Sequence, residues 1–474
     1  MANRGRSKGE VLYELLVRSE QEHLWAFFEN LPAEKHASLL AFLENLDLLL
    51  LRRETLRMRR TSCDGFRLKP PPCIGLPNTP EEESQWKQAR AIGMETLSRG
   101  ELAVVTAAGG QGTRLGFDHS KGLFPVTPVK QKTFFQLFAE KIRAEERRYS
   151  YAIPWLIMTG VEHLRETEEY FAKNDNFGLT AVHIFPQGQL PSMDLNGQMM
   201  LSAADTISTN PDGHGGLLPA MGRCGALEKL QKRGIRHLSY CQVDNPLARP
   251  LDATFIGFHV SENAQMSSRC VRKAFAGERV SIFASIDDQL RVVEHSDLPV
   301  ECATAMDAAN CLHFRLANVS MHIFTIDFLL PFCQPGSRSM LPLHAVPKKI
   351  PYLNSAGHLV RPVEVNAYKL EYFIFDLLLH AKRTLLLEGR REKLFSPIRN
   401  PRGLDSPETS YRDQMRLFAD WLAHAKVDLI RDSNGTPPFP IEIAPSFAVS
   451  CEEFQEKWRK LDPKPAIGPN FYLE

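Results

Sequence analysis

The 474-residue chain has no excess of charge of either sign and no long apolar run. Its 57 basic and 56 acidic side chains give a formal net charge of +1, which leaves no electrostatic case for a nucleic-acid partner. Apolar runs such as Leu48–Leu51 are far too short to cross a bilayer, and no apolar signal core follows the basic start of the chain. We therefore expect neither nucleic acid nor a membrane as a partner.

Cysteine pairs with metal-binding spacing are also missing. The nine cysteines are scattered along the chain and include no C-x-x-C pair, so a zinc framework has little support. An odd, scattered set is typical of reduced thiols, because disulfide frameworks belong to oxidising compartments. We expect a cytoplasmic protein.

What is present has an ordinary globular composition, 43% hydrophobic and 24% charged, and its length suits two or three domains. Apolar residues at helical spacing predict helices within 10–60, and prolines at 70–72 and 77–80 predict a linker after them. We expect an N-terminal helical region and linker over 1–98, a catalytic domain over 99–404 and a small C-terminal domain over 405–474.

From Leu102 onward, strand-like and helical patterns alternate. The expected strands are Leu102–Thr106, Pro154–Thr159, Ala181–Phe185, His237–Val243 and Phe255–Val260, and the helices between them are Phe134–Arg148, Leu164–Asn174 and Ala226–Arg233. Such alternation predicts an α/β domain with a mostly parallel sheet between helices, which binds ligands at the carboxyl ends of its strands.

The C-terminal part changes character. Residues 366–393 read as one helical region, and a further helix is expected at Tyr411–Ala425. Short strands at Phe439–Ile443 and Phe447–Val449 and a last helix complete the expected α+β domain.

A glycine-rich stretch follows the first expected strand. Gly109, Gly110 and Gly112 lie within four residues, where backbone N–H groups can form a concave nest for phosphate oxygens. Arg114 can grip phosphate with two donors, and Lys121 adds a second cation. Neither G-x-x-x-x-G-K-[ST] nor G-x-G-x-x-G occurs here. The stretch predicts a polyphosphate cradle of another type.

The string G-G-x-G-T-R-L-G followed by K-G resembles the signature of sugar nucleotidyltransferases, and specifically of the eukaryotic-type UDP-sugar pyrophosphorylase family. The resemblance implies a Rossmann-like, mixed-sheet nucleotidyltransferase core. It also implies that Gly109, Gly110, Gly112 and Thr113 bind the nucleotide, with Arg114 and Lys121 as catalytic cations.

Two further loops resemble family segments that surround uracil and sugar, Q-G-x-L-P at Gln187 and P-D-G-N-G-G at Gly213. The amide of Gln187 can read a uracil edge, and Gly213 permits close approach of the ring. His214 replaces the family's asparagine and inherits its sugar contact. The sequence around Gln187, Gln242–Pro246 and Leu404–Thr409 resembles a bacterial branch of the family more closely.

Asp244 ends an expected strand and so lies at the carboxyl edge of the sheet. Mg²⁺ prefers hard oxygen ligands and commonly takes one or two carboxylates with substrate phosphates. The matching aspartate in the family binds the metal, so Asp244 is the expected Mg²⁺ ligand.

Other family segments supply the remaining candidates. V-E-Y-S-[DE]-L matches at Glu294, with His295 in place of tyrosine, and Asn318 keeps a sugar-contact position. N-[GA]-[IV]-K-x-E matches at Lys369, and F-S-P-[LV]-K-N matches with Arg399 in place of lysine. The resemblance implies that Glu294, Asn318, Phe373 and Phe375 bind sugar and that Lys369 and Arg399 are catalytic cations.

The resemblance implies a uridylyltransferase that converts UTP and a sugar 1-phosphate to UDP-sugar and pyrophosphate with Mg²⁺. N-acetylglucosamine 1-phosphate is the favoured sugar phosphate, with glucose 1-phosphate or a broader range as the alternative. The departures at Ser120, His214, His295 and Arg399 keep open a different class, a nucleotide-binding pseudoenzyme with a regulatory or scaffolding role. The oligomeric state stays open.

Overall fold

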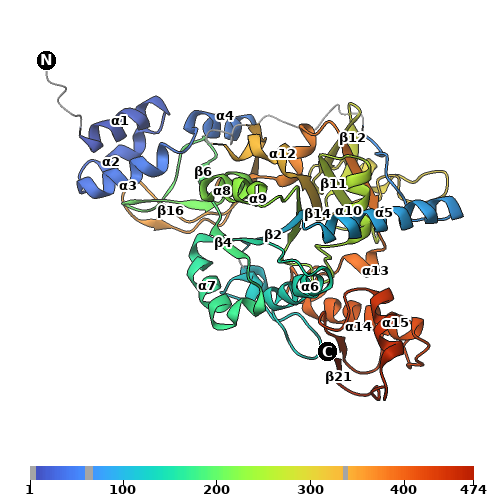
Figure 1. Cartoon of the computed structure of the whole chain (residues 1–474). Helices are drawn as coiled ribbons and strands as arrows, with labels where there is room; N and C mark the ends of the chain where they lie inside the picture. The colour runs from blue at the N-terminus through green and yellow to red at the C-terminus, as the bar shows by residue number, and fades with distance from the viewer. Residues whose placement is uncertain (1–6, 59–67, 111, 335–339) are drawn as a thin grey trace. The chain divides into compact units, whose positions relative to one another are not determined.

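A computed structural model describes residues 7–58, 68–110, 112–334 and 340–474 (Figure 1). By its internal contacts the chain divides into two compact units. Unit 1 comprises Met1–Gly65, Gln187–Pro219 and Gln334–Asp376, and unit 2 comprises Phe66–Pro186, Ala220–Cys333 and Leu377–Glu474. The predicted domain boundaries at 98/99 and 404/405 differ from this division and stay a prediction.

Unit 2 is built on a mixed sheet that has ten strands among the described residues. Four neighbouring strands run parallel in the order β10-β2-β3-β4, as expected for an α/β core. On the other side of β10 the pairing changes, because β14 runs antiparallel to β10, β11 and β12. The strands are β1 (Leu68–Lys69), β2 (Leu102–Ala108), β3 (Trp155–Thr159), β4 (Val182–Pro186), β10 (His237–Gln242), β11 (Met266–Arg272), β12 (Ile282–Ile286), β13 (Gln289–Val293), β14 (Leu316–Thr325) and β19 (Thr384–Glu388).

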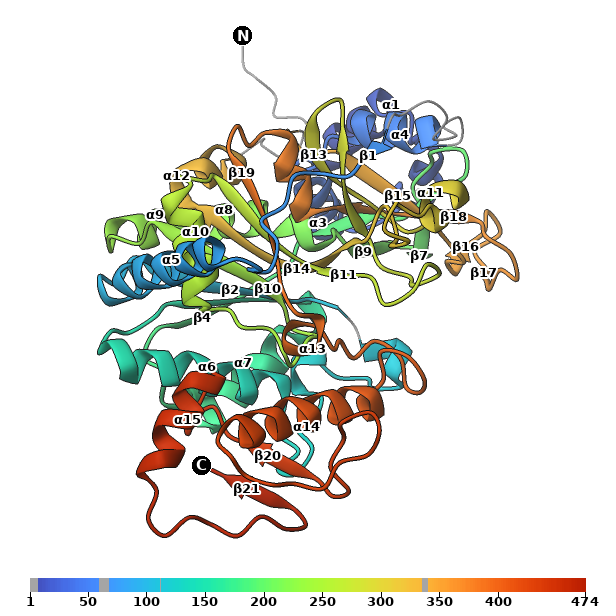
Figure 2. The ribbon, with the colours of Figure 1, turned by 90° about the vertical axis from the view of Figure 1, so that its right-hand side faces the viewer.

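Helices cover both faces of this sheet. Figure 2 shows α5 and α10 side by side above β2 and β10, and α6 and α7 below them. The face of α6 toward the sheet buries Phe134, Phe135 and Phe138 completely, next to the fully buried Trp155 of β3. The bounds are α5 (Pro80–Ser98), α6 (Phe134–Tyr149), α7 (Leu164–Lys173), α9 (Ala226–Lys232), α10 (Ala253–Ser261), α11 (Val300–Thr304), α12 (Ile326–Leu329) and α13 (Arg391–Leu394). The predicted mixed α/β fold is therefore confirmed.

The predicted strand Phe255–Val260 was wrong, because these residues lie in α10. The carboxylate of Asp252 caps the helix by accepting from the backbone N–H groups of Thr254 and Phe255. Gly257 lies against α5 so closely that a Cβ there would come within 1.6 Å of the Ala89 carbonyl oxygen. The apolar run is thus a helix buried against a second helix rather than a strand buried within a sheet.

The predicted helical region 366–393 was also wrong. It contains β18 (Ala367–Tyr372), a 3₁₀ segment at Ile374–Leu379, β19 and α13. Both strands find their partners far away in sequence, β18 on β15 (Leu343–Lys348) and β19 on β11. These non-local ladders decide the structure of the segment.

The C-terminal part of unit 2 has a hydrophobic cluster of its own, which includes Trp421, Ile441, Phe454 and Trp458. It lies between α14 (Pro407–His424), α15 (Cys451–Lys460) and the parallel pair β20 (Ile441–Ile443) and β21 (Phe471–Leu473). Residues 447–449, predicted as a strand, belong to no strand, and β21 takes the place beside β20.

Unit 1 combines short helices with small antiparallel sheets. Its central sheet has the order β15-β18-β6, with β6 at Met193–Asp194. The helices are α1 (Lys8–Arg18), α2 (Trp25–Phe28), α3 (Ala33–Leu43) and α4 (Leu48–Met58). The other strands are β5 (Gln189–Pro191), β7 (Leu201–Ala203), β8 (Thr206–Ile207), β9 (Thr209–Pro211), β16 (Tyr352–Leu353) and β17 (Leu359–Val360), and α8 (Leu217–Cys224) spans the point where the chain passes into unit 2. Of the helices in the described residues, none is long and apolar enough to cross a membrane.

Candidate active site

The glycine cradle follows the carboxyl end of β2, as predicted. Gly109 is buried, Gly110 is exposed with no atom within 4 Å of where its Cβ would lie, and Gly112 opens a 3₁₀ turn that ends at Leu115. A Cβ on Gly112 would come within 2.4 Å of the Phe117 carbonyl oxygen, so this turn requires glycine. Arg114 is exposed. The side chain of Thr113 lies outside the described part of the structure, so its predicted role stays a prediction.

Three of the predicted site residues meet at the end of β10. The Nζ of Lys121 lies 3.3 Å from Oδ2 of Asp244, and the Nε of Arg399 lies 3.0 Å from the same oxygen. The three side chains come from segments separated by more than 120 residues of sequence. We call Lys121, Asp244 and Arg399 the charge cluster.

Burial makes these charges strongly interdependent. Burial alone would raise the pKa of the Asp244 carboxyl, but the charges of Lys121 and Arg399 lower it to about 2. Burial lowers the pKa of Lys121, with Asp244 opposing and Arg399 and Arg114 adding to the decrease. Burial also disfavours the charged form of Arg399, yet Asp244 raises its pKa. The Asp244 carboxyl is therefore ionised at neutral pH beside the side chains of Lys121 and Arg399.

The backbone that carries Arg399 is fastened to the end of β10. The Ile398 N–H donates to the Asp244 carbonyl oxygen over 2.8 Å. The side chain of Asn245 donates to the Leu394 carbonyl oxygen over 2.7 Å and accepts from the Ser396 N–H over 3.1 Å. Asn245 is therefore a positioning residue. The only sign of this in the sequence is that it directly follows Asp244.

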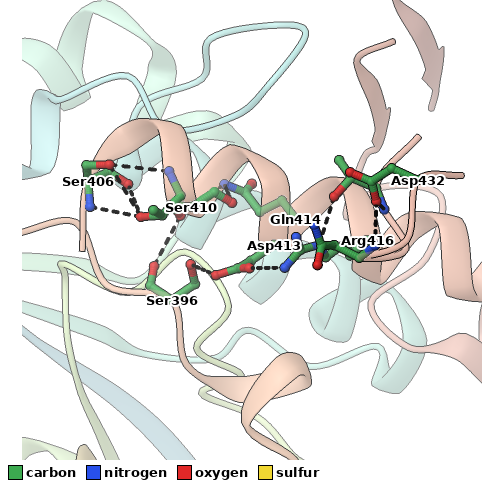
Figure 3. A network of polar contacts seen from close by, with 10 residues as sticks. Ser396, Ser406, Ser410, Asp413, Gln414, Arg416 and Asp432 are labelled. Carbon is green, nitrogen blue, oxygen red and sulfur yellow. Dashed lines mark hydrogen bonds and ion pairs between the residues drawn. The ribbon is translucent and has the colours of Figure 1, made fainter. Parts of the chain in front are cut away.

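A polar network fastens the same segment to α14 (Figure 3). Ser396 Oγ donates to Asp413 over 2.7 Å, and Ser410 Oγ donates to the Ser396 carbonyl oxygen over 3.1 Å. Asp413 also contacts Arg416, whose Nε donates to Thr436. Helix α14 thus supports the segment that positions Arg399 in the charge cluster.

The loop before Lys121 is held by a residue that the sequence did not single out. The carboxylate of Glu166 on α7 accepts from the Ser120 N–H over 3.0 Å and contacts Nδ1 of His119 at 2.5 Å. Burial would raise the pKa of Glu166, but these two hydrogen bonds lower it. Glu166 thereby fixes the stretch that contains Ser120, one of the departures from the family pattern.

The predicted sugar-contact residues of unit 2 belong to one sheet, in which β12 lies between β13 and β14. Glu294 directly follows β13, and its charge is among those that raise the pKa of Arg399. Asn318 is buried in β14, where its Oδ1 accepts from the Ser320 N–H over 2.9 Å. Its Nδ2 has no partner among the described residues, which leaves a donor for a ligand or a water.

In unit 1 the structure brings together the residues predicted around the uracil and the sugar. Gly213 adopts φ +81°, and a Cβ there would come within 2.4 Å of the Tyr372 carbonyl oxygen. The Nε2 of Gln187 donates to the Gly213 carbonyl oxygen over 2.7 Å. Tyr372 N–H donates to the Asp212 carbonyl oxygen, which joins this loop to the end of β18.

His214 lies among aromatic rings. Its ring stacks on Phe373 with centroids 5.2 Å apart and lies 5.4 Å from Phe375. His344, which the sequence analysis missed, stacks on the Phe373 ring at 4.1 Å and contacts Asp376 at 2.7 Å. Only pairing through the antiparallel ladder of β15 and β18 brings His344 into this cluster.

Burial, with a smaller contribution from His344, lowers the pKa of His214 to about 3. Because its Nδ1 accepts the Ile374 N–H over 3.0 Å, the neutral ring carries its proton on Nε2. His214 is therefore a fixed hydrogen-bond donor at neutral pH.

Lys369 also lies in unit 1, and its Nζ is 2.8 Å from Oε1 of Glu371 on the same strand. The β15–β18 register places Glu371 opposite His344 and Lys369 opposite Val346. Lys369 and Glu371 thus lie on one face of β18. The same alternation places Phe373, directly after the strand, on that face. The carboxylate holds the ammonium group in place.

The residues around Asp244 suit a magnesium ion that brings most of its ligands with it. Both contacts of the Asp244 carboxylate go to Oδ2, so Oδ1 is free of partners among the described residues. The described residues contain no group of three or more His, Cys, Asp or Glu side chains placed to hold a metal. A single carboxylate is what Mg²⁺ uses when substrate phosphates and water supply the other ligands.

Comparison with known proteins agrees with this geometry. Residues 77–360 match the family described as UTP--glucose-1-phosphate uridylyltransferase. A Mus musculus protein named UDP-N-acetylhexosamine pyrophosphorylase-like protein 1 is 34% identical over 92% of each chain. The Saccharomyces cerevisiae UDP-N-acetylglucosamine pyrophosphorylase is 34% identical, over 87% of this chain and 88% of the yeast protein.

The fold matches as well. The Trypanosoma brucei uridine diphosphate N-acetylglucosamine pyrophosphorylase aligns over 100% of this chain and 99% of its own, with a TM-score of 0.82 and 24% identity. The fold and the glycine cradle define a nucleotidyltransferase. The chain belongs to the UTP--glucose-1-phosphate uridylyltransferase family. These relatives are eukaryotic, so the expected bacterial branch finds no support.

Proposed function

We propose that the chain transfers the uridylyl group of UTP to N-acetylglucosamine 1-phosphate. The charge cluster beside the glycine cradle carries this proposal, because it gathers phosphate-binding groups where an α/β sheet binds its ligands. Relatives named UDP-N-acetylglucosamine pyrophosphorylase support the choice of sugar. Glucose 1-phosphate or a broader range of sugar phosphates is the alternative.

The chemistry is a displacement at phosphorus. An oxygen of the sugar phosphate forms a bond to the α-phosphorus of UTP as the bond to the bridging oxygen of pyrophosphate breaks. The protein's own groups position the reactants and neutralise charge, so a covalent nucleophile is not needed. Lys121 and Arg114 would hold the triphosphate and stabilise the departing pyrophosphate, while Arg399 and Lys369 would neutralise the attacking phosphate.

Asp244 would hold a magnesium ion through Oδ1, and the ion would supply further neutralisation of phosphate charge. Gln187 and Gly213 would contact the uracil, and the donor on His214 would serve a sugar hydroxyl or acyl oxygen between Phe373 and Phe375. Glu294 and Asn318 are further proposed sugar contacts. The eight described cysteines are free thiols, which supports a reducing, cytoplasmic setting.

The test measures pyrophosphate release from UTP and Mg²⁺ with N-acetylglucosamine 1-phosphate, glucose 1-phosphate and galactose 1-phosphate. We expect release with the first, and at least a hundredfold lower kcat in Asp244→Ala, which leaves the half-buried side chains of Lys121 and Arg399 without their carboxylate. Asp428→Ala, at an exposed aspartate of unit 2, is the matched control and should retain activity. UTP binding without turnover of any sugar phosphate would contradict the proposal and favour the pseudoenzyme.

A further inference from the structure

Unit 2 contains a cavity of about 400 Å³ away from the glycine cradle. It is lined by α5, the C-terminal turns of α6, the segment between β10 and α10, and the start of α13. Its volume falls in the range of small-molecule sites. None of the residues assigned above to the nucleotide, the sugar or the metal lines it.

Positive charge dominates the lining, because it has six basic side chains and three acidic ones, Glu145, Asp252 and Glu452. Two of the basic side chains are paired, Arg148 with Glu145 at 3.3 Å and Arg269 with Asp252 at 2.7 Å. The other four form no hydrogen bond or ion pair with any described residue: Arg90, Arg249, Arg390 and Lys393. Arg249 lowers the pKa of Asp252 and Glu452 through its charge, while Arg90, Arg390 and Lys393 are exposed at the rim. The remaining excess of positive charge around one cavity favours an anionic occupant.

Arg269 gives a second, independent indication. Its guanidinium group is buried, with only 3% of the residue exposed, and two of its nitrogens donate to Asp252 and to the Glu388 carbonyl oxygen. Its Nε is buried without a partner among the described residues. A buried donor without a partner is rare in folded proteins and is satisfied by a ligand or an ordered water.

The remaining wall is apolar and includes Leu76, Pro77 and the half-buried ring of Trp86. The Trp86 ring is held edge-to-face against Phe258 of α10, with centroids 5.6 Å apart. A fixed indole beside unpaired guanidinium groups suits a molecule that has both a ring and a phosphate group.

We propose that this cavity is an effector site for a phosphate-bearing small molecule with a sugar or base ring. Two short connections lead from it to the charge cluster. Asp244 lies five residues before Arg249, and Lys393 lies six residues before Arg399. The side chain of Asn245 ties these two connections together by donating to Leu394, which lines the cavity. An occupant that draws Arg249 and Lys393 inward therefore acts on the backbone that positions Asp244 and Arg399.

Calorimetric titration with a hexose 6-phosphate and with ATP tests the site, and inorganic phosphate separates the ring's contribution from that of the anion. We expect one of the ring-bearing probes to bind the full-length protein. The double variant Arg90→Ala/Arg390→Ala should weaken that binding at least tenfold. Lys87→Ala, an exposed cation on α5 that does not line the cavity, is the matched control and should leave it unchanged.

Binding must also survive Lys121→Ala, which alters the cradle, so that this inference and the proposed function fail separately. Lys393→Ala provides a second cavity variant if the double variant unfolds. Equal affinity in the cavity variants and in Lys87→Ala, or no binding of either ring-bearing probe at millimolar concentration, would overturn the site. Binding that leaves the rate of pyrophosphate release unchanged would overturn its role as an effector site.

Discussion

At the scale of single residues, His214 shows how a histidine can supply the same neutral hydrogen-bond donor as an asparagine. An asparagine at this position, as in the family segment that the loop resembles, offers an N–H donor that stays neutral at every pH. The structure gives His214 the same properties, because Nδ1 is occupied by the Ile374 N–H and burial lowers the pKa of the ring to about 3. The histidine is thus a neutral donor through Nε2 and adds a surface that stacks on Phe373.

We expect His214→Asn to keep most of the activity, within about tenfold in kcat/KM, because the donor is retained. His214→Leu keeps the bulk and removes the donor, so it should raise KM for the sugar phosphate by about ten- to a hundredfold. Since the ring stays neutral above pH 4, the pH profile of kcat/KM between pH 5 and 8 should have the same shape in the wild type and in His214→Asn. A limb near pH 6.5 that disappears in this variant would show that the ring titrates during catalysis.

The charged residues of the site could be predicted from the sequence. The residues that fix the backbone around them could not. Lys121, Asp244 and Arg399 could be named because each lies in a distinctive string, and the structure brings all three together. Glu166 and Asn245 act through backbone groups 46 and 149 residues away, so no local pattern announces them. His344 likewise reaches the aromatic cluster only through the pairing of two strands.

At the scale of elements, the turn at Gly213 joins the Gln187 loop to the end of β18 and depends on the absence of a side chain. Gly213→Ala should cost about 2 to 4 kcal/mol of stability in unit 1, because φ is positive and the new Cβ meets the Tyr372 carbonyl. Activity should fall with it, mainly through KM for UTP.

Gly357→Ala is the matched control for that turn. Gly357 has a similar φ of +78° but open space around its Cβ position, so it should cost only about 1 kcal/mol and leave KM unchanged. Chemical denaturation and steady-state kinetics measure both variants. Equal losses in the two would mean that φ alone, rather than the close approach to Tyr372, accounts for the glycine.

The elements that the sequence mispredicted share one physical cause. The apolar run 255–260 has no period that separates a buried strand from a buried helix, and the decisive signal was the cap at Asp252 a few residues earlier. In 366–393 the strands β18 and β19 are stabilised by ladders to β15 and β11. Local propensity cannot report a partner that lies tens of residues away.

At the scale of the whole molecule, the near-neutral net charge conceals buried ionisable groups whose titration affects stability. Burial raises the pKa of Glu145 on α6 from its ordinary value of 4.5 to about 7, although Arg148 acts in the opposite direction. The folded state therefore binds the proton more tightly than the unfolded state. This contribution is present below pH 4.5 and is lost as the pH rises to 7.

Glu145→Gln should remove this pH dependence and leave the protein more stable than the wild type at pH 8, by up to about 3 kcal/mol. Urea unfolding at pH 5 and at pH 8 measures the effect. Glu168→Gln, at an exposed position of α7, is the control and should leave the difference between the two pH values unchanged. A loss of stability in Glu145→Gln at pH 8 would instead mean that the ion pair with Arg148 outweighs the cost of burial.

The single carboxylate shared by Lys121 and Arg399 has one more consequence. A metal ion arriving alone would meet an aspartate whose charge two cations already offset, and a triphosphate arriving alone would pull those cations away from a buried carboxylate. A metal ion held at Oδ1 of Asp244 would be offset by the phosphates that arrive with it, and those phosphates would be met by Lys121 and Arg399 beside Oδ2. If both ligands bind here, each should raise the affinity of the site for the other by the same factor.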